Sequence, residues 1–414
     1  FAPGLDLPRA DGTIARWNPP SLDSLHPESL ATELPAEFLA PASGSDVPPA
    51  PLPDVAAIDT AETPAKQEGP SPFEALLQGD TSAKRAPSAE APPTSASELV
   101  EALARRVAPS ATDAPSSGSG VDADRLVSII RSPAFRRLES HWLSLRRLVT
   151  QTPDTPELSI HVSDVTRDEL LAGLRAQGSS PDALPSPLLG GDRFSPSLIV
   201  VVEPFSNTLE ELGLLTALGI FASLHGAPLI GEATSAFVGR SNWSHWRSDG
   251  DGEIDPTLQE TWDAMRSGPV GPWIGLAAPR PMARQPYGAG SDPTDDPPIE
   301  EVTQPGETDG YPWGSSAIAA AELLAAAFTQ QGWNMSSNDR LDLEDLPNVT
   351  FTSDGEIERV PPTEIWLDDR AVTRLESHGL MAWMSDRHRN RARLAGFHSI
   401  AQPVTPLAGS WERH

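Results

Sequence analysis

Proline crowding between residues 41 and 97 limits what this chain can fold into, because eleven of its 44 prolines fall there. A segment of this kind cannot bury enough apolar surface to offset the entropy lost on ordering, so we expect a flexible linker. Within it, PFEALLQG at 72–79 predicts one short helix, and a second helix followed by more linker is predicted at 98–120. Folded structure is then expected in a short N-terminal segment, 1–40, and in one domain, 121–414.

The composition argues against several classes of function. The chain has 58 acidic and 30 basic residues, a formal net charge of −28, which disfavours nucleic-acid and anionic-membrane partners. Cysteine is absent, which excludes disulfides, zinc–thiolate sites and thiol nucleophiles. Its lysines, Lys66 and Lys84, both lie in the linker, so the domain has neither a P-loop lysine nor a Schiff-base amine. Without a membrane-spanning apolar run or a signal peptide, we expect a cytoplasmic protein.

Patterns typical of strands and of helices alternate through the domain. Strands are predicted at 158–166, 198–202, 227–233, 272–281, 364–369 and 380–385. Helices are predicted at 167–178, 208–226, 315–332 and 369–379. This alternation predicts an α/β fold whose mixed, largely buried sheet carries helices on both faces. One further late strand is predicted within 393–404.

Three of these elements carry more specific predictions. Alternating apolar residues in 158–166 predict a half-buried strand, whereas the unbroken apolar run 198–202 predicts a strand covered on both faces. In 208–226, Thr208 and Glu211 have the spacing of a capping box, and apolar residues run all round the helix. We therefore expect this helix to be buried on every side.

The sequence SPAFRRLESHWLSLRRLV, residues 132–149, predicts an amphipathic helix that docks on the domain core. Ser132 can cap it, and Pro133 suits the first helical position. Steps of three and four residues place one apolar stripe on the helix, made of Phe135, Leu138, Trp142, Leu145 and Leu148. Charged residues are predicted to face elsewhere, namely Arg136, Arg137, Glu139 and Arg146.

A search for catalytic motifs gives little. No two of the nine histidines have the i, i+4 spacing of a helical zinc site, and neither a G-x-S-x-G elbow nor a glycine-rich dinucleotide fingerprint occurs. Residues 285–310 hold seven acids and no base, which predicts a solvated loop. We expect no catalytic, cofactor or metal site.

The most site-like stretch is PRPMARQPYG, residues 279–288. Its arginines, Arg280 and Arg284, could grip a phosphate or carboxylate of a ligand, or could pair with buried acids of the domain, which we favour. Five tryptophans of the C-terminal part could line a pocket, although core packing is their commoner role: Trp273, Trp313, Trp333, Trp366 and Trp383.

The order of these motifs resembles the large subunit of the type VI secretion contractile sheath. The likeness runs through PAFRRLESHWLSLRRLV, WIGLAAPRPMARQPYG, YPWGSSAIAAAELLAAAFTQQGW and PPTEIWLDD and covers roughly residues 121–400. SLDSLHPESL near the N-terminus is similar to a segment of the small sheath subunit, which implies a small-subunit remnant within 1–40. The large subunits run on into further strands and a strand-exchanging extension, which is not seen after LAGSWERH.

This resemblance implies a non-catalytic structural protein, either a sheath subunit or an accessory that caps, adapts or nucleates. Its implied partners are sheath, tube or baseplate proteins, or further copies of the chain, with no nucleic acid and no membrane. The alternative is a reused α/β domain that binds a ligand or catalyses a reaction at Arg280 and Arg284. On the sheath reading, the residues that organise fold and contacts are Phe135, Leu138, Glu139, Trp142, Leu145, Arg280, Arg284, Tyr287, Trp313, Trp333 and Glu364.

Overall fold

A computed structural model of the chain describes part of its residues in detail. These are residues 4–9, 13–39, 122–177, 196–246, 252–304, 308–353 and 356–412, which belong to one compact unit. The linker predicted at 41–97, its helix at 72–79 and the segment 98–120 lie outside them and stay predictions. Over the described ranges, no helix has the length and apolar character needed to cross a bilayer.

A six-stranded mixed sheet forms the centre of this unit, as the alternating patterns predicted. Four neighbouring strands are parallel: β3 (Ile199–Phe205), β4 (Leu229–Ala233), β5 (Ile274–Ala278) and β9 (Leu380–Ser385). Two short strands continue the sheet in antiparallel fashion: β10 (Ala392–Leu394) and then β6 (Asp342–Leu343). Strands β4 and β5 are buried at every residue, as expected of parallel strands covered on both faces.

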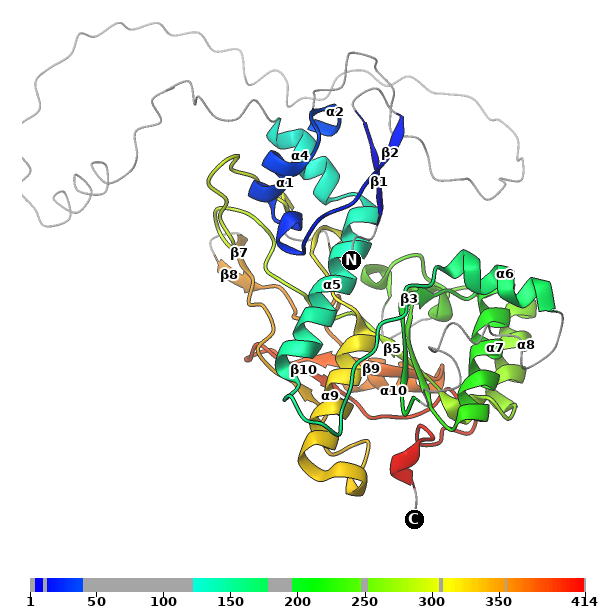
Figure 1. The fold of residues 1–414 in the computed structure, drawn as a ribbon. Coiled ribbons are helices and arrows are strands. Elements are labelled where there is room, and N and C mark those ends of the chain that lie inside the picture. Colours follow the sequence, from blue (N-terminus) through cyan, green and yellow to red (C-terminus); the bar gives the residue numbers. More distant parts are fainter. Residues whose placement is uncertain are drawn as a thin grey trace, which may run out of the picture. The chain divides into compact units, whose positions relative to one another are not determined.

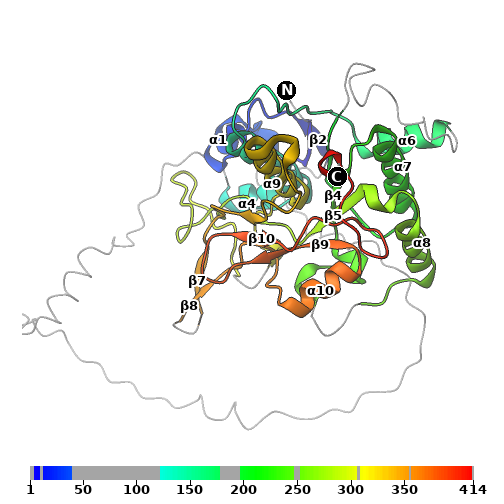
Figure 2. The same cartoon turned by 90° about the horizontal axis from the view of Figure 1, so that it is seen from below.

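Helices cover both faces of the sheet, and alternate strand residues serve the two sides (Figures 1 and 2). Leu229, Leu276 and Leu380 belong to one core cluster, whose helices are α7 (Leu209–His225), α8 (Pro256–Ser267) and α10 (Asp369–Ser377). Ile230 and Met381 belong to the opposite cluster, which packs under α9 (Ser316–Gln331). The predicted α/β class with helices on both faces is confirmed.

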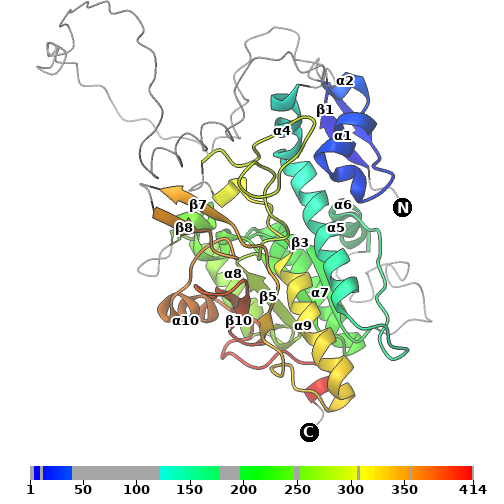
Figure 3. The same ribbon diagram turned by 90° about the vertical axis from the view of Figure 1, so that its left-hand side faces the viewer.

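A second group of elements packs around the long helix α5 (Pro133–Gln151), seen in Figure 3. The hairpin of β1 (Leu5–Pro8) and β2 (Ile14–Trp17) is followed by α1 (Pro27–Glu33) and α2 (Ala36–Leu39). These elements share a core with α4 (Ala123–Ile130) and with the start of α5, formed by Leu7, Leu30, Phe38, Leu126, Ile130 and Phe135 among others. The Arg125 guanidinium donates from Nε to the Phe38 carbonyl at 3.0 Å.

Two predicted strands are absent. Residues 158–166 are extended but join no sheet, and Ile160 and Val162 are 39% and 61% exposed, because no strand pairs with them to create a buried face. Residues 364–369 form a loop that leads into α10, with only an isolated bridge just before it, between Thr363 and Pro281. A helix, α6 (Arg167–Gln177), does follow the first of these segments as predicted.

Two further predictions hold only in part. Strand β3 forms where an apolar run predicted it, but it is an edge strand whose residues before Phe205 are half-buried, so it is not covered on both faces. The late strand predicted within 393–404 is limited to β10, which ends at Leu394, and His398 then makes only an isolated bridge to Pro406. A second small hairpin, β7 (Thr350–Ser353) and β8 (Glu356–Arg359), pairs separately from the main sheet.

Helix α7 follows its predicted boundaries but not its predicted burial. Thr208 accepts a hydrogen bond from the Glu211 backbone N–H at 3.3 Å, while the Glu211 carboxylate pairs with Arg167 at 2.6 Å instead of closing a capping box. Gly226 ends the helix in the left-handed region with φ 62°. Leu209 and Leu224 are 58% and 60% exposed, so the prediction of burial on every side is wrong for one face.

Replacing Gly226 with alanine is expected to lower the free energy of unfolding by about 1 kcal/mol, because an L-residue is strained at this φ. Gly213 on the same helix is the matched control: a Cβ added there meets no atom within 4 Å, so Gly213→Ala should stabilise by up to about 1 kcal/mol. Denaturant unfolding of the two variants measures both changes. Equal destabilisation by both would contradict this account of the helix end.

Candidate functional site

The arginine-bearing segment 279–288 follows directly on β5 and is held in place by backbone hydrogen bonds. The Met282 N–H donates to the Pro362 carbonyl at 2.9 Å, and the Pro281 carbonyl accepts from the Gly314 N–H at 2.7 Å. The segment is therefore clamped between the loop that precedes α9 and the loop that precedes α10. Its two arginines point into separate buried ion-pair clusters.

In the first cluster, Arg280 pairs with Glu364. Its Nη2 and Nε lie 2.7 and 3.1 Å from Glu364 Oε1, and its backbone N–H donates to Oε2 at 2.8 Å. A second carboxylate, Glu232 at the end of β4, lies 3.8 Å from Arg280 Nε. Both carboxylates are 5% exposed, so one cation holds two buried acids together.

Glu232 also meets the N-terminus of α9. Its Oε2 accepts from the Ser316 N–H at 3.0 Å, and the Ser316 hydroxyl donates to the Ala277 carbonyl at 2.8 Å. Burial raises the pKa of Glu232 to about 7, against the opposing influence of Arg280, and the neighbouring charge of Glu364 raises it further. The first cluster thus joins β4, β5, α9 and the loop before α10.

In the second cluster, Arg284 bridges two carboxylates from distant parts of the chain. Its Nε and Nη2 donate to the two oxygens of Glu139 at 2.8 and 2.9 Å, and Nη1 donates to Glu301 Oε2 at 2.6 Å. Further bonds go to Glu301 Oε1 and to the Gln285 carbonyl. Glu139 and Glu301 are 3% and 0% exposed. Every N–H of the Arg284 guanidinium is thereby directed at a protein acceptor.

Tyr287 connects this cluster to the N-terminal elements. The Arg284 guanidinium lies 3.9 Å from the centre of the Tyr287 ring, and the Tyr287 N–H donates to Glu301 Oε2 at 3.0 Å. On its other side the ring meets His26 edge-to-face, with centroids 5.2 Å apart. Burial raises the pKa of the Tyr287 hydroxyl above its usual range. The ring belongs to the core that Leu30 and Phe38 also form.

The acidic loop 285–310 is therefore not simply solvated, which corrects the prediction. Glu301 is fully buried against Arg284, and Ile299 and Thr294 are 5% and 7% exposed. The Glu301 carboxylate lies 3.6 Å from Arg136 Nη2 on α5, so basic partners outside the loop neutralise it. Composition within the loop could not show these partners, because they come from elsewhere in the chain.

The buried face of α5 also differs from the predicted apolar stripe. Its buried residues are Phe135, Glu139, Ser140, Ser144 and Leu148, whereas three stripe members are half-buried: Leu138, Trp142 and Leu145. The prediction that Glu139 faces away from the core is wrong, because Arg284 compensates its charge there. The predicted start is confirmed, with the Ser132 hydroxyl accepting from the Phe135 N–H at 3.4 Å.

Two polar side chains attach the second half of α5. The Ser144 hydroxyl accepts from the Ser315 N–H at 2.8 Å. Arg147 pairs with Glu322 of α9 at 2.9 Å and also donates to the Glu344 carbonyl at 2.7 Å. Serine at 144 gave no sequence signal of a contact, since a lone serine on a helix is usually exposed.

The predicted tryptophans do not gather around one pocket. Trp313 is 5% exposed, and its Nε1–H donates to the Thr308 carbonyl at 2.7 Å. Trp383 is fully buried under α9, and Trp273 is half-buried. Trp333 is 50% exposed after α9 and packs on Phe328, with ring centroids 4.8 Å apart. Trp366 lies under the Arg387 guanidinium, 5.3 Å away.

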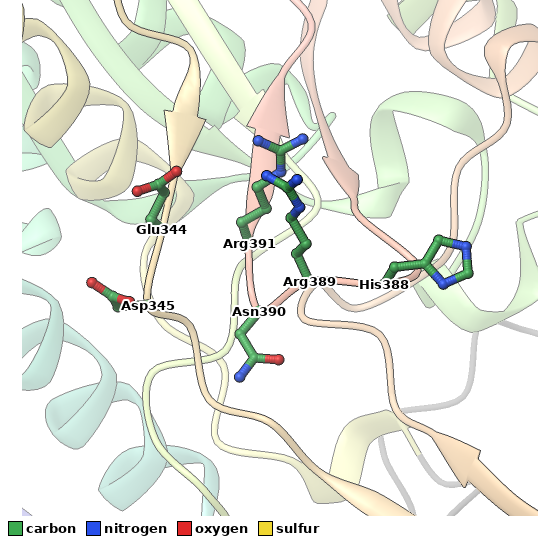
Figure 4. Close-up of a pocket in the computed structure, with 6 residues that line it drawn as sticks. All are labelled: Glu344, Asp345, His388, Arg389, Asn390 and Arg391. Atoms are coloured by element: carbon green, nitrogen blue, oxygen red, sulfur yellow. The ribbon is translucent and has the colours of Figure 1, made fainter.

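An open polar pocket of about 380 Å³ lies at the turn between β9 and β10, apart from both arginine clusters (Figure 4). The carboxylates of Glu344 and Asp345 lie on one side, and the guanidinium groups of Arg389 and Arg391 on the other. Arg391 is already paired with Asp386 at 2.9 Å. Both signs of charge line the pocket, so it selects no one class of ligand. No cluster of metal-ligating residues occurs within the described ranges.

Comparison with known proteins adds independent information. The family model VipB (EvpB/VC_A0108, tail sheath N-terminal domain) matches residues 123–401, from the first residue of α4 to beyond β10. The type VI secretion system sheath protein TssC1 of Pseudomonas aeruginosa is 28% identical over 296 residues, which cover 67% of this chain and 58% of that protein. The chain therefore spans less than two thirds of that relative's length. The matched family range contains both arginine clusters, and the elements from β1 to α2 precede it.

Proposed function

The chain belongs to the VipB family of tail sheath N-terminal domains, and from this membership we propose that it is a structural component of a type VI-like contractile secretion apparatus. It acts as a sheath-type subunit or as a sheath-derived accessory, cap or assembly protein, without catalysis. The observation that carries this proposal is the family match over residues 123–401, which takes in the whole six-stranded sheet and its helices.

The arginine clusters support a scaffolding role. Arg280 and Arg284 pair with buried carboxylates from four other segments, so they hold segments together instead of presenting free donors to a ligand. The proposed role of the motif residues is accordingly to fix the fold and its contacts. The ligand-binding or enzymatic reading would need donors of Arg284 that its protein partners already occupy.

The elements from β1 to α2 support a second part of the proposal. They pack on α4, α5 and Tyr287 within the described unit, yet precede the range that matches the sheath domain. Residues 21–30 resemble a segment of the small sheath subunit. These N-terminal elements accordingly serve as a small-subunit remnant that the chain carries itself, tethered through residues 41–97.

The partners in this proposal are sheath, tube or baseplate proteins of the same cytoplasmic apparatus, or further copies of the chain. Sedimentation velocity of the chain, alone and mixed with the sheath and tube proteins of its own system, tests it. We expect large species or tubules, visible by electron microscopy, that a tube protein from an unrelated contractile system does not induce. A species that sediments as an isolated monomer in every mixture would refute the assembly role.

A further inference from the structure

The outward face of α7 is an apolar stripe, made of Leu209, Gly213, Ala217, Ile220 and Leu224. At 100° per residue these five positions fall within a sector of about 80° on the helix. Leu209 and Leu224 are 58% and 60% exposed, Gly213 is exposed, and the two others are half-buried. Single exposed leucines are ordinary, but a stripe that is apolar along a whole helix indicates a binding surface.

The stripe reads the same from both ends, which points to its partner. Leu209 and Leu224 are equally far from a centre between residues 216 and 217, and so are Gly213 and Ile220. A two-fold axis through this centre would bring Leu209 of one copy to Leu224 of the other. A second copy of the same helix in antiparallel orientation therefore matches large residues at the ends and small ones toward the middle.

Gly213 supports the same arrangement. A glycine inside a helix costs up to about 1 kcal/mol relative to alanine. A Cβ at Gly213 would meet no atom within 4 Å, so nothing in its own unit requires the missing side chain. In the antiparallel pair, Ile220 of the other copy lies opposite this position and needs the space. Ala217, next to the axis, lets the two backbones approach closely.

Charge at the two helix ends favours antiparallel over parallel pairing. The first turn of α7 carries Glu210 and Glu211, and its last turn carries His225. Antiparallel packing sets the acidic end of one helix beside the basic end of the other and opposes the two helix dipoles. Parallel packing would place like ends together.

We propose that α7 is a homotypic docking surface, on which two copies of the chain pack their α7 helices antiparallel about a two-fold axis near Ala217. This contact is additional to the assembly role proposed above and needs no other protein. One helix per copy is a small interface, so we expect a reversible dimer that forms at micromolar or higher concentration.

Disulfide cross-linking tests the proposal cleanly, because the chain has no cysteine of its own. Under mild oxidation, Ala217→Cys should cross-link with itself, since this residue lies next to the axis. Leu209→Cys and Leu224→Cys should each fail alone and should cross-link when mixed. Glu260→Cys, exposed on α8, is the control and should stay monomeric in every mixture.

Leu224→Glu introduced beside Ala217→Cys should reduce the cross-linked fraction at least tenfold, and thermal unfolding should show the same midpoint because residue 224 is exposed. Three results would overturn the proposal: no Ala217→Cys dimer at 100 µM protein (roughly the upper micromolar range), self-cross-linking of Leu209→Cys, or cross-linking that survives Leu224→Glu. These outcomes involve the chain alone, so they are distinct from a failure to bind sheath or tube proteins.

Discussion

Replacing Arg284 with alanine is expected to lower the free energy of unfolding by about 3–5 kcal/mol, the range seen when one partner of a buried ion pair is removed. Glu139 and Glu301 would be left as buried carboxylates 3% and 0% exposed, at 2.8 and 2.6 Å from groups no longer present. The loss should appear in urea unfolding as a shift of the midpoint with little change of slope.

A charge-free version of the same cluster is the control. Arg284→Met combined with Glu139→Gln and Glu301→Gln removes all three charges while keeping the volumes close, and should regain most of the lost stability. Arg284→Lys should recover only part of it, because a lysine cannot reproduce the bidentate contacts with two carboxylates. An Arg284→Ala variant within about 1 kcal/mol of the wild type, the typical contribution of an exposed pair, would contradict the buried network.

The second large effect is a pH dependence at Glu232. Its folded-state pKa of about 7 exceeds the model value of 4.5, so the folded chain holds this proton more tightly than the unfolded chain. The stabilisation is complete below pH 4.5 and is lost as pH rises through 7. Glu232→Gln imitates the protonated form, so its stability relative to wild type should increase by about 3 kcal/mol between pH 4.5 and pH 8.

Denaturant unfolding of wild type and Glu232→Gln at several pH values measures this difference. Glu260→Gln on α8, at an exposed position, is the matched control and should follow the wild-type profile. The amide keeps an oxygen that can accept from the Ser316 N–H, so the capping contact with α9 is preserved. Parallel profiles for wild type and Glu232→Gln across this pH range would show that Glu232 does not titrate as its burial requires.

Local sequence signals predicted the helices and central strands well. Ser132 and Pro133 marked the start of α5, Thr208 and Gly226 marked the ends of α7, and all four have those roles in the structure. These signals depend on a few neighbouring residues, so a single sequence contains them in full. The buried strands β4 and β5 were likewise evident as short apolar runs.

The failures concern information that neighbouring residues do not carry. The alternation in 158–166 is typical of a strand, but a strand also needs a partner, and none pairs with it. The apolar run of β3 could not show that it would lie at a sheet edge, with one side unpaired. The same limit applies to α7, whose apolar residues gave no indication of which face would remain exposed.

At the candidate site, the sequence identified the arginines but not the full set of partners. Arg280 and Arg284 stood out in 279–288, and pairing with buried acids was the favoured reading. Glu139 was assigned to the wrong face of α5 and Glu301 to a solvated loop, because the Arg284 that neutralises both carboxylates contacts them only through tertiary packing. A buried charge is recognisable only together with its partner, and that partner lay up to 145 residues away.

The central claim is that this chain takes part in a contractile sheath as a structural component. Cryo-electron microscopy of sheaths assembled from the system's own sheath and tube proteins, with this chain added, tests it most directly. We predict density for the six-stranded sheet and its helices, residues 122–412, at the sheath wall or at one of its ends. Sheaths that assemble identically with and without the chain, and show no such density, would contradict the claim.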